Sequence, residues 1–339
     1  MRLLITGGAG FIGSAACRYF IHKGYEICNV DKLTYAANIN NLYTIQNHTR
    51  YHFVQEDICN ARRIRDIVFS FKPSAILHLA AESHVDRSIL DSSAFLQANV
   101  IGTTVLLNVA VEYRKSSDCP EEFRFHHVST DEVYGDLAFG EGAFLETTPY
   151  NPSSPYSASK AASDFMVSSW HRTYGLPVVI SNCSNNYGPF QNPEKLIPLT
   201  IVNALQGKSL PVYGDGLNVR DWLYVDDHIE ALDKIMTHGS LGGRYNIGGC
   251  NEWRNIDVVQ LICSILDKKQ PRSDGKSYAE QVRFVSDRLG HDRRYAIDAS
   301  KLKRELAWMP RHDFETGLKK TVEWYLENSW WWTGRNKTA

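Results

Sequence analysis

The chain has 339 residues, of which 43% are hydrophobic and 22% are charged. This balance is typical of a folded globular protein and excludes an intrinsically disordered one. The formal net charge is -1, so there is no basic field that would attract nucleic acid or an anionic membrane, and we expect neither as a partner.

The first predicted element is a short buried strand over residues 2–6, followed by a glycine-rich turn and a helix that stops at Gly24. Gly7, Gly10 and Gly13 would let the turn tighten, the backbone approach a pyrophosphate, and the helix pack on the strand. The helix N-terminus then offers free N–H groups to phosphate. Taken alone, this pattern also fits a plain strand-to-helix turn.

A second strand, predicted over residues 26–30, supplies the context that favours a dinucleotide site. It ends in Asp31, about 20 residues beyond the glycines, where a carboxylate can bond the adenosine ribose diol. The same carboxylate would repel a 2′-phosphate, so NAD is favoured over NADP.

A third strand is predicted over residues 51–55. Asp57 and Ile58 follow it, at the place where an adenine ring would lie. Asp57 could equally cap the helix that is predicted over residues 61–71.

A fourth strand, predicted over residues 75–79, leads into Ala80 and Ala81. Loops at the carboxyl ends of parallel strands line the ligand crevice, so these two alanines are expected beneath the cofactor. His84, in the same loop, either faces the substrate or is hydrogen-bonded within the loop.

The stretch after the fifth predicted strand, residues 123–128, gathers side chains that can transfer protons. They are Thr130, Asp131 and Glu132 just after the strand, and Tyr156 and Lys160 on a later predicted helix. Tyr156 and Lys160 share one helix face, where the ammonium favours the phenolate. The adjacent carboxyls add a possible acid and a possible base. The alternatives are a backbone hydrogen bond for Thr130, and helix capping or a salt bridge for the carboxyls.

The remaining elements surround these motifs. A long amphipathic segment is predicted over 92–114, in which Asn99 is expected to be structural, and a surface loop over 135–155. A helix over 156–174 and a sixth strand over 178–182 follow. Beyond them the elements shorten and the loops lengthen, which predicts a smaller lobe.

This order of elements predicts an α/β fold, a Rossmann-type doubly wound parallel sheet with a smaller mixed α/β C-terminal lobe. Residues 1–185 would form the NAD-binding domain, with segments near 215–250 returning to it. Residues 186–339 would mainly bind the substrate.

The motifs resemble those of the extended short-chain dehydrogenase/reductase family. The Tyr-x-x-x-Lys motif and the glycine signature are shared throughout that family, so they indicate only the class. The Asp-Glu pair within Ser129 to Gly135 is more specific, because it resembles the pair with which the sugar-nucleotide dehydratases eliminate water. Further matching runs lie at 78–88, 182–189, 193–198, 220–225 and 290–295.

The resemblance implies a lyase that dehydrates a nucleotide sugar with tightly held NAD. Tyr156 would take the proton of the sugar 4-hydroxyl as hydride leaves C4, and Thr130 would bond the same oxygen. Lys160 would hold the cofactor ribose and lower the tyrosine pKa. Glu132 would remove the C5 proton and protonated Asp131 would donate to the departing 6-hydroxyl, giving a 4-keto-6-deoxy sugar.

Resemblance also implies two sets of binding residues. The cofactor set is Gly7, Gly10, Phe11, Ile12, Gly13, Asp31, Lys32, Asp57, Ile58, Leu79, Ala80, Ala81, Ser83, Tyr156, Lys160 and Asn186. The substrate set is Ser83, Thr130, Asn185, Lys195, Leu196, Pro211, Val212, Tyr213, Arg220, Asn255, Arg288 and His291. No metal site is expected.

Several members of the substrate set have alternative interpretations. Arg220 matches diphosphate oxygens bidentately, but it could instead form a salt bridge with Asp221 or Asp226. Asn255 could cap a helix over 256–267, and Tyr213 could stack on a base or pack in the lobe. Lys195, Arg288 and His291 could simply be solvated.

For partners, the resemblance favours thymidine as the base, hence dTDP-glucose as substrate, and a homodimer paired through 92–114 and 156–174. A sugar-nucleotide 4-epimerase would share the cofactor site but leave the Asp131–Glu132 pair without a role. A sugar-nucleotide decarboxylase would need an extra cation instead of that pair. A non-catalytic NAD-binding protein would not need the proton-transferring groups.

Two further observations concern the compartment. The seven cysteines are odd in number and lack a C-x-x-C spacing, which favours reduced thiols. No apolar segment is expected to reach membrane-spanning length. We therefore expect a cytoplasmic protein.

Overall fold

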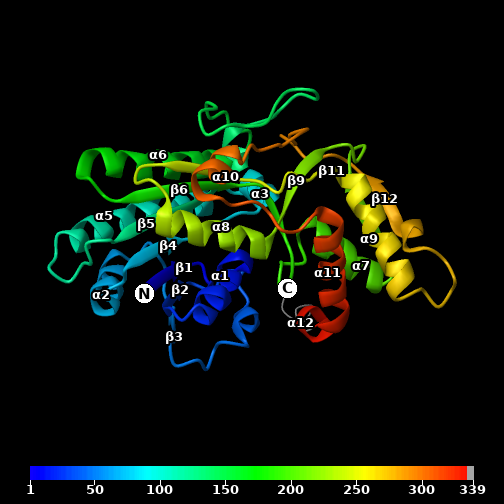
Figure 1. The fold of residues 1–339 in the computed structure, drawn as a ribbon. Coiled ribbons are helices and arrows are strands. Elements are labelled where there is room, and N and C mark those ends of the chain that lie inside the picture. The colour runs from blue at the N-terminus through cyan, green and yellow to red at the C-terminus, as the bar shows by residue number, and fades with distance from the viewer. Residues whose placement is uncertain (334–339) are drawn as a thin grey trace.

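The computed structural model describes residues 1–333 and is built around one parallel sheet (Figure 1). Its seven strands lie in the order β10-β6-β5-β4-β1-β2-β3. Their bounds are β1 Arg2–Thr6, β2 Glu26–Asp31, β3 Tyr51–Gln55, β4 Ala75–His78, β5 Arg124–Thr130, β6 Val178–Cys183 and β10 Arg244–Ile247. The order reverses between β1 and β4, the switch point at which such sheets bind ligands. The predicted Rossmann-type fold is confirmed.

Helices cover both faces of the sheet, which explains why β1, β2, β4, β5 and β6 are buried along nearly their whole length instead of on one face only. One layer contains α1 (Phe11–His22) and α8 (Val225–His238), whose apolar residues share a core cluster with β1. The opposite layer contains α2 (Ala61–Phe71), α5 (Thr103–Arg114) and α6 (Pro155–Tyr174). The polar residues at the carboxyl ends of the strands are therefore left to form a site there.

The segment predicted as one helix over 92–114 is interrupted. After α3 (Val85–Leu90), a short α4 (Ser93–Phe95) runs into a π-helix, Leu96–Gly102, before α5. The whole stretch is apolar and long enough to cross a membrane by length and composition, contrary to our expectation, yet half of its most apolar window is buried inside the molecule. Such burial is typical of a core helix, and α5 packs on α2 and α6.

The second half of the chain adds two small sheets. One has the order β11-β9-β7 and the other pairs β12 with β8. The strands are β7 Asn185–Tyr187, β8 Leu210–Tyr213, β9 Val219–Tyr224, β11 Glu252–Arg254 and β12 Val282–Val285. The helices are α7 Leu196–Leu205, α9 Asn255–Lys269, α10 Ser300–Leu306, α11 Phe314–Glu327 and α12 Ser329–Thr333.

The three-stranded sheet is mixed, since β9 runs parallel to β7 and antiparallel to β11. Its core is aromatic, with buried Tyr187, Trp222, Phe314 and Trp331 packed between the sheets and α7, α9 and α11. β10 and α8 return to the large sheet. The division at residue 185 stays a prediction, and the last six residues of the predicted substrate lobe lie outside the described part.

Candidate active site

The turn between β1 and α1 places glycine backbone, without side chains, at the carboxyl ends of the strands. Gly7 has a φ of +76°, and a Cβ there would lie 2.7 Å from the Ala80 nitrogen. A Cβ on Gly13 would collide with the Gly7 carbonyl oxygen. Only glycine fits at these positions, and the backbone between them is free to approach a phosphate.

Asp31, at the end of β2, holds this turn in place. Its Oδ2 accepts a hydrogen bond from the Ala9 N–H (2.9 Å) and its Oδ1 accepts one from the Leu33 N–H (2.8 Å). Burial raises the pKa of Asp31, and the two backbone donors and Lys32 oppose that rise. The carboxylate is therefore both a structural anchor and a wall of the site.

Asp57 does not cap the following helix. Asn60 is the N-cap of α2, and its side chain accepts a hydrogen bond from the Arg63 N–H (3.3 Å). Asp57 instead accepts from the Cys59 N–H (2.9 Å) and lies 3.5 Å from the Lys32 ammonium. The capping alternative is wrong because the helix begins three residues later than Asp57 would require.

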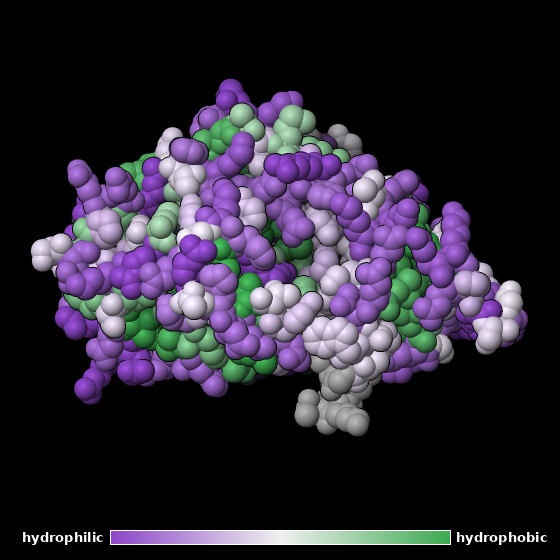
Figure 2. Space-filling model, turned by 60° about the horizontal axis from the view of Figure 1, so that its bottom comes forward, coloured by the Kyte–Doolittle hydropathy of each residue, from purple (hydrophilic) through white to green (hydrophobic). Residues whose placement is uncertain are grey.

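A pocket runs along the carboxyl ends of the strands, and Figure 2 shows a hollow near the middle of one face, rimmed by hydrophilic residues. Most of the sequence-predicted residues line it: Gly7, Gly10, Phe11, Ile12, Gly13, Asp31, Lys32, Ile58, Leu79, Ala80, Ala81, Ser83, Thr130, Asp131, Glu132, Tyr156, Lys160, Asn185, Asn186 and Lys195. The sequence missed others, among them Thr34, Ala37, Ser129, Cys183, Ser184, Gln191 and Glu194. Ser129 and Cys183 lie near the ends of β5 and β6 and the others in loops, and several fall within the matched runs without having been chosen as site residues.

Local capping explains how the proton-transferring side chains are placed. α6 begins with a capping box between Ser154 and Ser157, with Pro155 in its first turn. The Tyr156 N–H donates to the Ser88 hydroxyl (3.2 Å). The start of α6, with Tyr156 and Lys160 on it, is thereby fixed against α3.

Asp131 and Glu132 lie side by side in a short 3₁₀ turn, Asp131–Tyr134, in different electrostatic surroundings. Burial raises the pKa of Asp131 well above its ordinary value, and the Glu132 charge raises it further. Burial also raises the pKa of Glu132, but Arg288, Lys195 and Arg220 oppose that rise. These surroundings favour the protonated form of Asp131 more than that of Glu132, whose ionised form the three cations favour.

Tyr156 differs from the sequence-based expectation. Burial raises the pKa of its phenol well above the ordinary value, and the Glu132 charge adds to the rise. The Lys160 ammonium donates to the Val128 carbonyl oxygen (2.9 Å), and the contact that lowers the phenol pKa is with Thr130. Lys160 is not among the main groups that set the phenol pKa in this arrangement of side chains, so its lowering of the tyrosine pKa stays a prediction.

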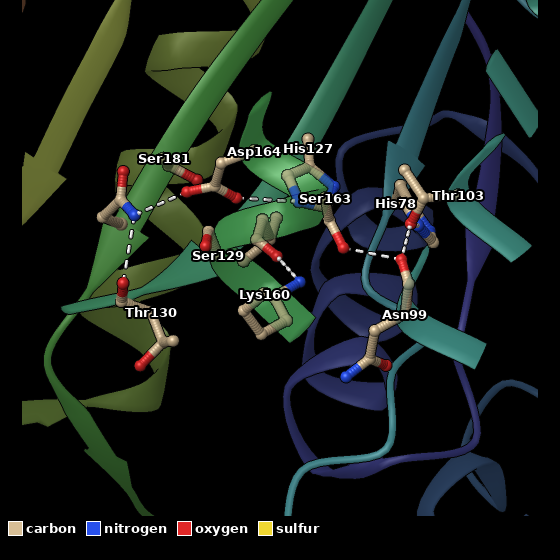
Figure 3. A network of polar contacts seen from close by, with 12 residues as sticks. His78, Asn99, Thr103, His127, Ser129, Thr130, Lys160, Ser163, Asp164 and Ser181 are labelled. Carbon is tan, nitrogen blue, oxygen red and sulfur yellow. Dashed lines mark hydrogen bonds and ion pairs between the residues drawn. The ribbon is translucent and has the colours of Figure 1, made fainter. Parts of the chain in front are cut away.

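A buried polar network lies behind these groups (Figure 3). The Asp164 carboxylate is within 3.1 Å of His127 Nε2 and accepts hydrogen bonds from the Tyr150 hydroxyl (2.5 Å) and the Asn182 amide (3.2 Å). The same amide donates to the Thr130 carbonyl oxygen (3.0 Å). Asp164 was missed from the sequence, although its position four residues after Lys160 on one helix face was a usable signal.

Asn99 is structural, as expected. Its side chain accepts from the Glu82 N–H (2.9 Å) and donates to the Glu82 carbonyl (3.0 Å) and the Ser159 hydroxyl (2.8 Å). It therefore ties the pocket loop after β4 to α6. His84 lies 3.7 Å from Glu194, a pocket-lining residue of another segment, so both interpretations of His84 stay predictions.

Arg220 forms no salt bridge with Asp221 or Asp226, which removes that alternative. Its guanidinium donates to the Val219 carbonyl (2.8 Å) and the Asp292 carbonyl (2.9 Å). It also lies 4.3 Å from the centre of the Tyr295 ring. Neither carbonyl carries a charge, so the guanidinium remains available to bind an anion.

Tyr213, Arg288 and His291 lie together at the far end of the site, outside the pocket wall. Arg288 is 3.6 Å from the Asp86 carboxylate, and the Tyr213 and His291 rings meet edge to face. His291 lies 2.6 Å from Asp287. These contacts exclude the alternative of freely solvated side chains for Arg288 and His291.

The other predicted substrate residues are more dispersed. Lys195 donates to the Ser83 carbonyl (3.2 Å) and is half-buried, so it too is not simply solvated. α9 begins at Asn255 with Arg254 as N-cap, so the capping alternative for Asn255 is wrong. Leu196 packs against the core of the smaller lobe and Val212 lies within it; Pro211 precedes Val212 on β8.

The seven-stranded sheet, the glycine turn and the Tyr156–Lys160 pair define the extended short-chain dehydrogenase/reductase class. Residues 4–321 match the family model described as GDP-mannose 4,6 dehydratase, and the chain belongs to that family. A dTDP-glucose 4,6-dehydratase from Salmonella typhimurium is 55% identical over 98% of this chain and 94% of its own length. One from Neisseria meningitidis is 54% identical over 98% and 95%.

Solved structures of related enzymes have the same fold as this chain. A dTDP-glucose 4,6-dehydratase from Streptomyces venezuelae, crystallised with NAD, is 44% identical with a TM-score of 0.90 over 99% of this chain and 100% of its own. A UDP-glucose 4-epimerase from Thermotoga maritima reaches 0.86 at 28% identity over 97% and 100%. The fold alone therefore does not separate dehydratase from epimerase.

Proposed function

We propose that this protein is a dTDP-glucose 4,6-dehydratase, a hydro-lyase that converts dTDP-glucose to dTDP-4-keto-6-deoxyglucose and water. The observation that carries this is the Asp131–Glu132 pair, in which three cations oppose the rise of the Glu132 pKa while the pKa of Asp131 is raised well above its ordinary value, and both lie beside Tyr156 in one pocket. Elimination of water needs an acid and a base at once. An epimerase does not eliminate water, so it would leave the Asp131–Glu132 pair without a role.

NAD fits the residues of the pocket. The cradle at Gly7 and Gly13 admits no side chain, and Asp31 stands at the end of β2, where a ribose diol can be bonded. When bound, NAD would accept the C4 hydride, return it to C6, and add a positive charge that favours an ionised Tyr156. The proposed cofactor contacts are those predicted from the sequence, with Asp57 acting through Lys32.

The chain's own groups move the protons. Tyr156 takes the proton of the sugar 4-hydroxyl, and Thr130 holds the same oxygen. Once C4 is a ketone, the C5 proton is acidic enough for Glu132 to remove. Asp131 donates its proton to the 6-hydroxyl, which leaves as water, and Glu132 returns its proton to C5 when the hydride goes to C6. The Asp131 Oδ2 is buried without a hydrogen-bond partner among the described residues, so it is open to a substrate group.

The diphosphate of the substrate is assigned to the cations around Glu132, namely Arg220, Arg288 and Lys195. Asn185 lines the pocket beside them. Tyr213 is 43% exposed, which leaves a ring face for stacking on the base. The remaining contacts follow the sequence-based set, with those of Leu196 and Val212 made by backbone.

We also assign a homodimer and a cytoplasmic location to the protein. The π-helix and α6 carry exposed apolar side chains, including Ile101 (47%) and Phe165 (60%). Exposed apolar side chains on two packed helices are suited to a partner. All seven cysteines are free thiols, which suits a reducing compartment.

The test is incubation of the purified protein with dTDP-glucose and no added NAD, followed by mass spectrometry. We expect loss of one water, and Glu132→Gln should reduce the rate by roughly 10²–10⁴-fold because only the base is lost. NAD should be detectable in the denatured protein.

The control is Glu252→Gln, which removes a carboxylate that pairs with Arg294 away from the pocket. It should retain full activity. An unchanged substrate mass with the 4-hydroxyl inverted would instead establish an epimerase and remove the roles of Asp131 and Glu132.

A further inference from the structure

The backbone of the glycine-rich turn is held at Ala9 by three hydrogen bonds. Its N–H donates to Asp31, and its carbonyl accepts from the Asn38 N–H (2.9 Å) and from the Asn41 side-chain amide (3.1 Å). Asn38 and Asn41 belong to the segment after β2 that ends in the 3₁₀ turn Ile39–Leu42. This segment is therefore tied directly to the turn that receives the pyrophosphate.

The other end of the chain holds the same segment. The Trp331 indole N–H donates to the Asn41 side-chain oxygen (2.8 Å), and both residues are buried. Arg18 of α1 donates to the Asn41 carbonyl (2.5 Å) and lies over the Phe190 ring, which Trp331 meets edge to face. Figure 1 accordingly places α12, at the red end, near the blue N-terminal layer.

The opposite wall of the pocket is also held by the C-terminal helices, through α11, which precedes α12. The Tyr325 hydroxyl of α11 donates to the Gln191 carbonyl (2.6 Å), and the Gln191 amide donates to the Asn186 carbonyl (2.8 Å). Gln191 and Asn186 line the pocket. The Tyr325 and Trp331 rings are in contact with each other. One aromatic unit thus joins both walls.

We propose that Trp331 is a positioning residue that retains the dinucleotide, by fixing the Asn41 segment against the glycine-rich turn. This inference rests on the proposed NAD site and adds to it a device that slows release. Opening the pocket on the adenosine side requires the Asn41 segment to leave Ala9, and the bond from Trp331 opposes that movement. The physical effect is on the rate of NAD loss, since Trp331 itself is not in the pocket wall.

The experiment compares two matched substitutions in the protein loaded with NAD. Trp331→Phe keeps an aromatic ring but removes the bond to Asn41. Trp332→Phe removes an equally buried indole bond, to the Tyr325 carbonyl (2.9 Å), which stays within the C-terminal helices. Each protein is diluted into NAD-free buffer, and retained NAD is measured over time by absorbance after rapid gel filtration.

We expect Trp331→Phe to lose NAD roughly three- to tenfold faster than the parent, as the loss of one buried hydrogen bond would give. Trp332→Phe should lose NAD at about the parent rate. Equal acceleration in both variants, or none in Trp331→Phe, would overturn the inference while leaving the proposed function intact. A parent protein that binds no NAD would overturn both.

Discussion

Asp164 is a fully buried carboxylate one helical turn after Lys160, in contact with His127, Tyr150 and Asn182. Burial would raise its pKa, but the contact with His127 and the Lys160 charge lower it instead. Burial in turn lowers the pKa of Lys160, and Asp164 is the first group that opposes this. The two charges therefore keep each other ionised in a dry interior.

This coupling predicts the behaviour of Asp164→Asn. Without the carboxylate, the pKa of Lys160 falls further, so the alkaline limb of the kcat/KM profile should begin at lower pH. The other titratable groups facing Lys160 are His127, His78 and Cys183. Activity at pH values where Lys160 is still charged should fall much less.

Tyr150→Phe is the matched control, because it removes one hydrogen bond to Asp164 and leaves the charge. Its pH profile of kcat/KM should keep the parent's alkaline limb. An unshifted limb in Asp164→Asn would show that Asp164 has only a structural role.

Among the elements, those fixed by local sequence were predicted and those fixed by distant contacts were not. Residues 2–6 were identified at their observed bounds because this buried parallel strand is an apolar run between Arg2 and Thr6, whereas residues 51–55 form a partly buried edge strand in which polar and apolar residues mix. The π-helix Leu96–Gly102 was missed, since the expected helical periodicity covers it equally well. The bond of Arg220 to Asp292 depends on packing between segments 72 residues apart, which no spacing in the sequence reports.

The exposed apolar side chains of the π-helix and α6 lead to a prediction about assembly. Phe165→Glu places a charge in the proposed dimer interface, where burying a charge without an opposite charge beside it costs free energy. We expect a monomer by light scattering at concentrations where the parent is a dimer. Phe284→Glu alters an equally exposed ring (59%) on β12 and should leave the dimer unchanged. A dimeric Phe165→Glu protein would place the interface elsewhere.

Across the whole molecule, four histidines are buried within the fold. Burial lowers the pKa of His126 and of His228 to about 3 and of His127 to about 4, and lowers that of His78 well below its ordinary value. Each is neutral when folded but titrates near 6.5 when unfolded. Their stabilising contribution is thus complete above about pH 6.5 and is lost as the pH falls toward the folded values.

The protein should therefore be sensitive to acid. At pH 5 the loss is about 2 kcal/mol for each of His126 and His228. Thermal unfolding measured between pH 7.5 and 5 should show a falling midpoint, and His126→Gln should reduce the steepness of that fall. A midpoint with the same pH dependence in parent and variant would contradict this account.

The late position of β10 in the chain has a consequence for biosynthesis. β10 is the outermost strand beside β6, and its residues come more than 60 positions after β6 in the sequence. While the chain emerges from the ribosome, β6 therefore has one row of unpaired peptide groups until residue 247 has left the exit tunnel. An open strand edge is a site of intermolecular pairing. Nascent chains of this protein are thus exposed to aggregation, and to capture by chaperones, for that interval.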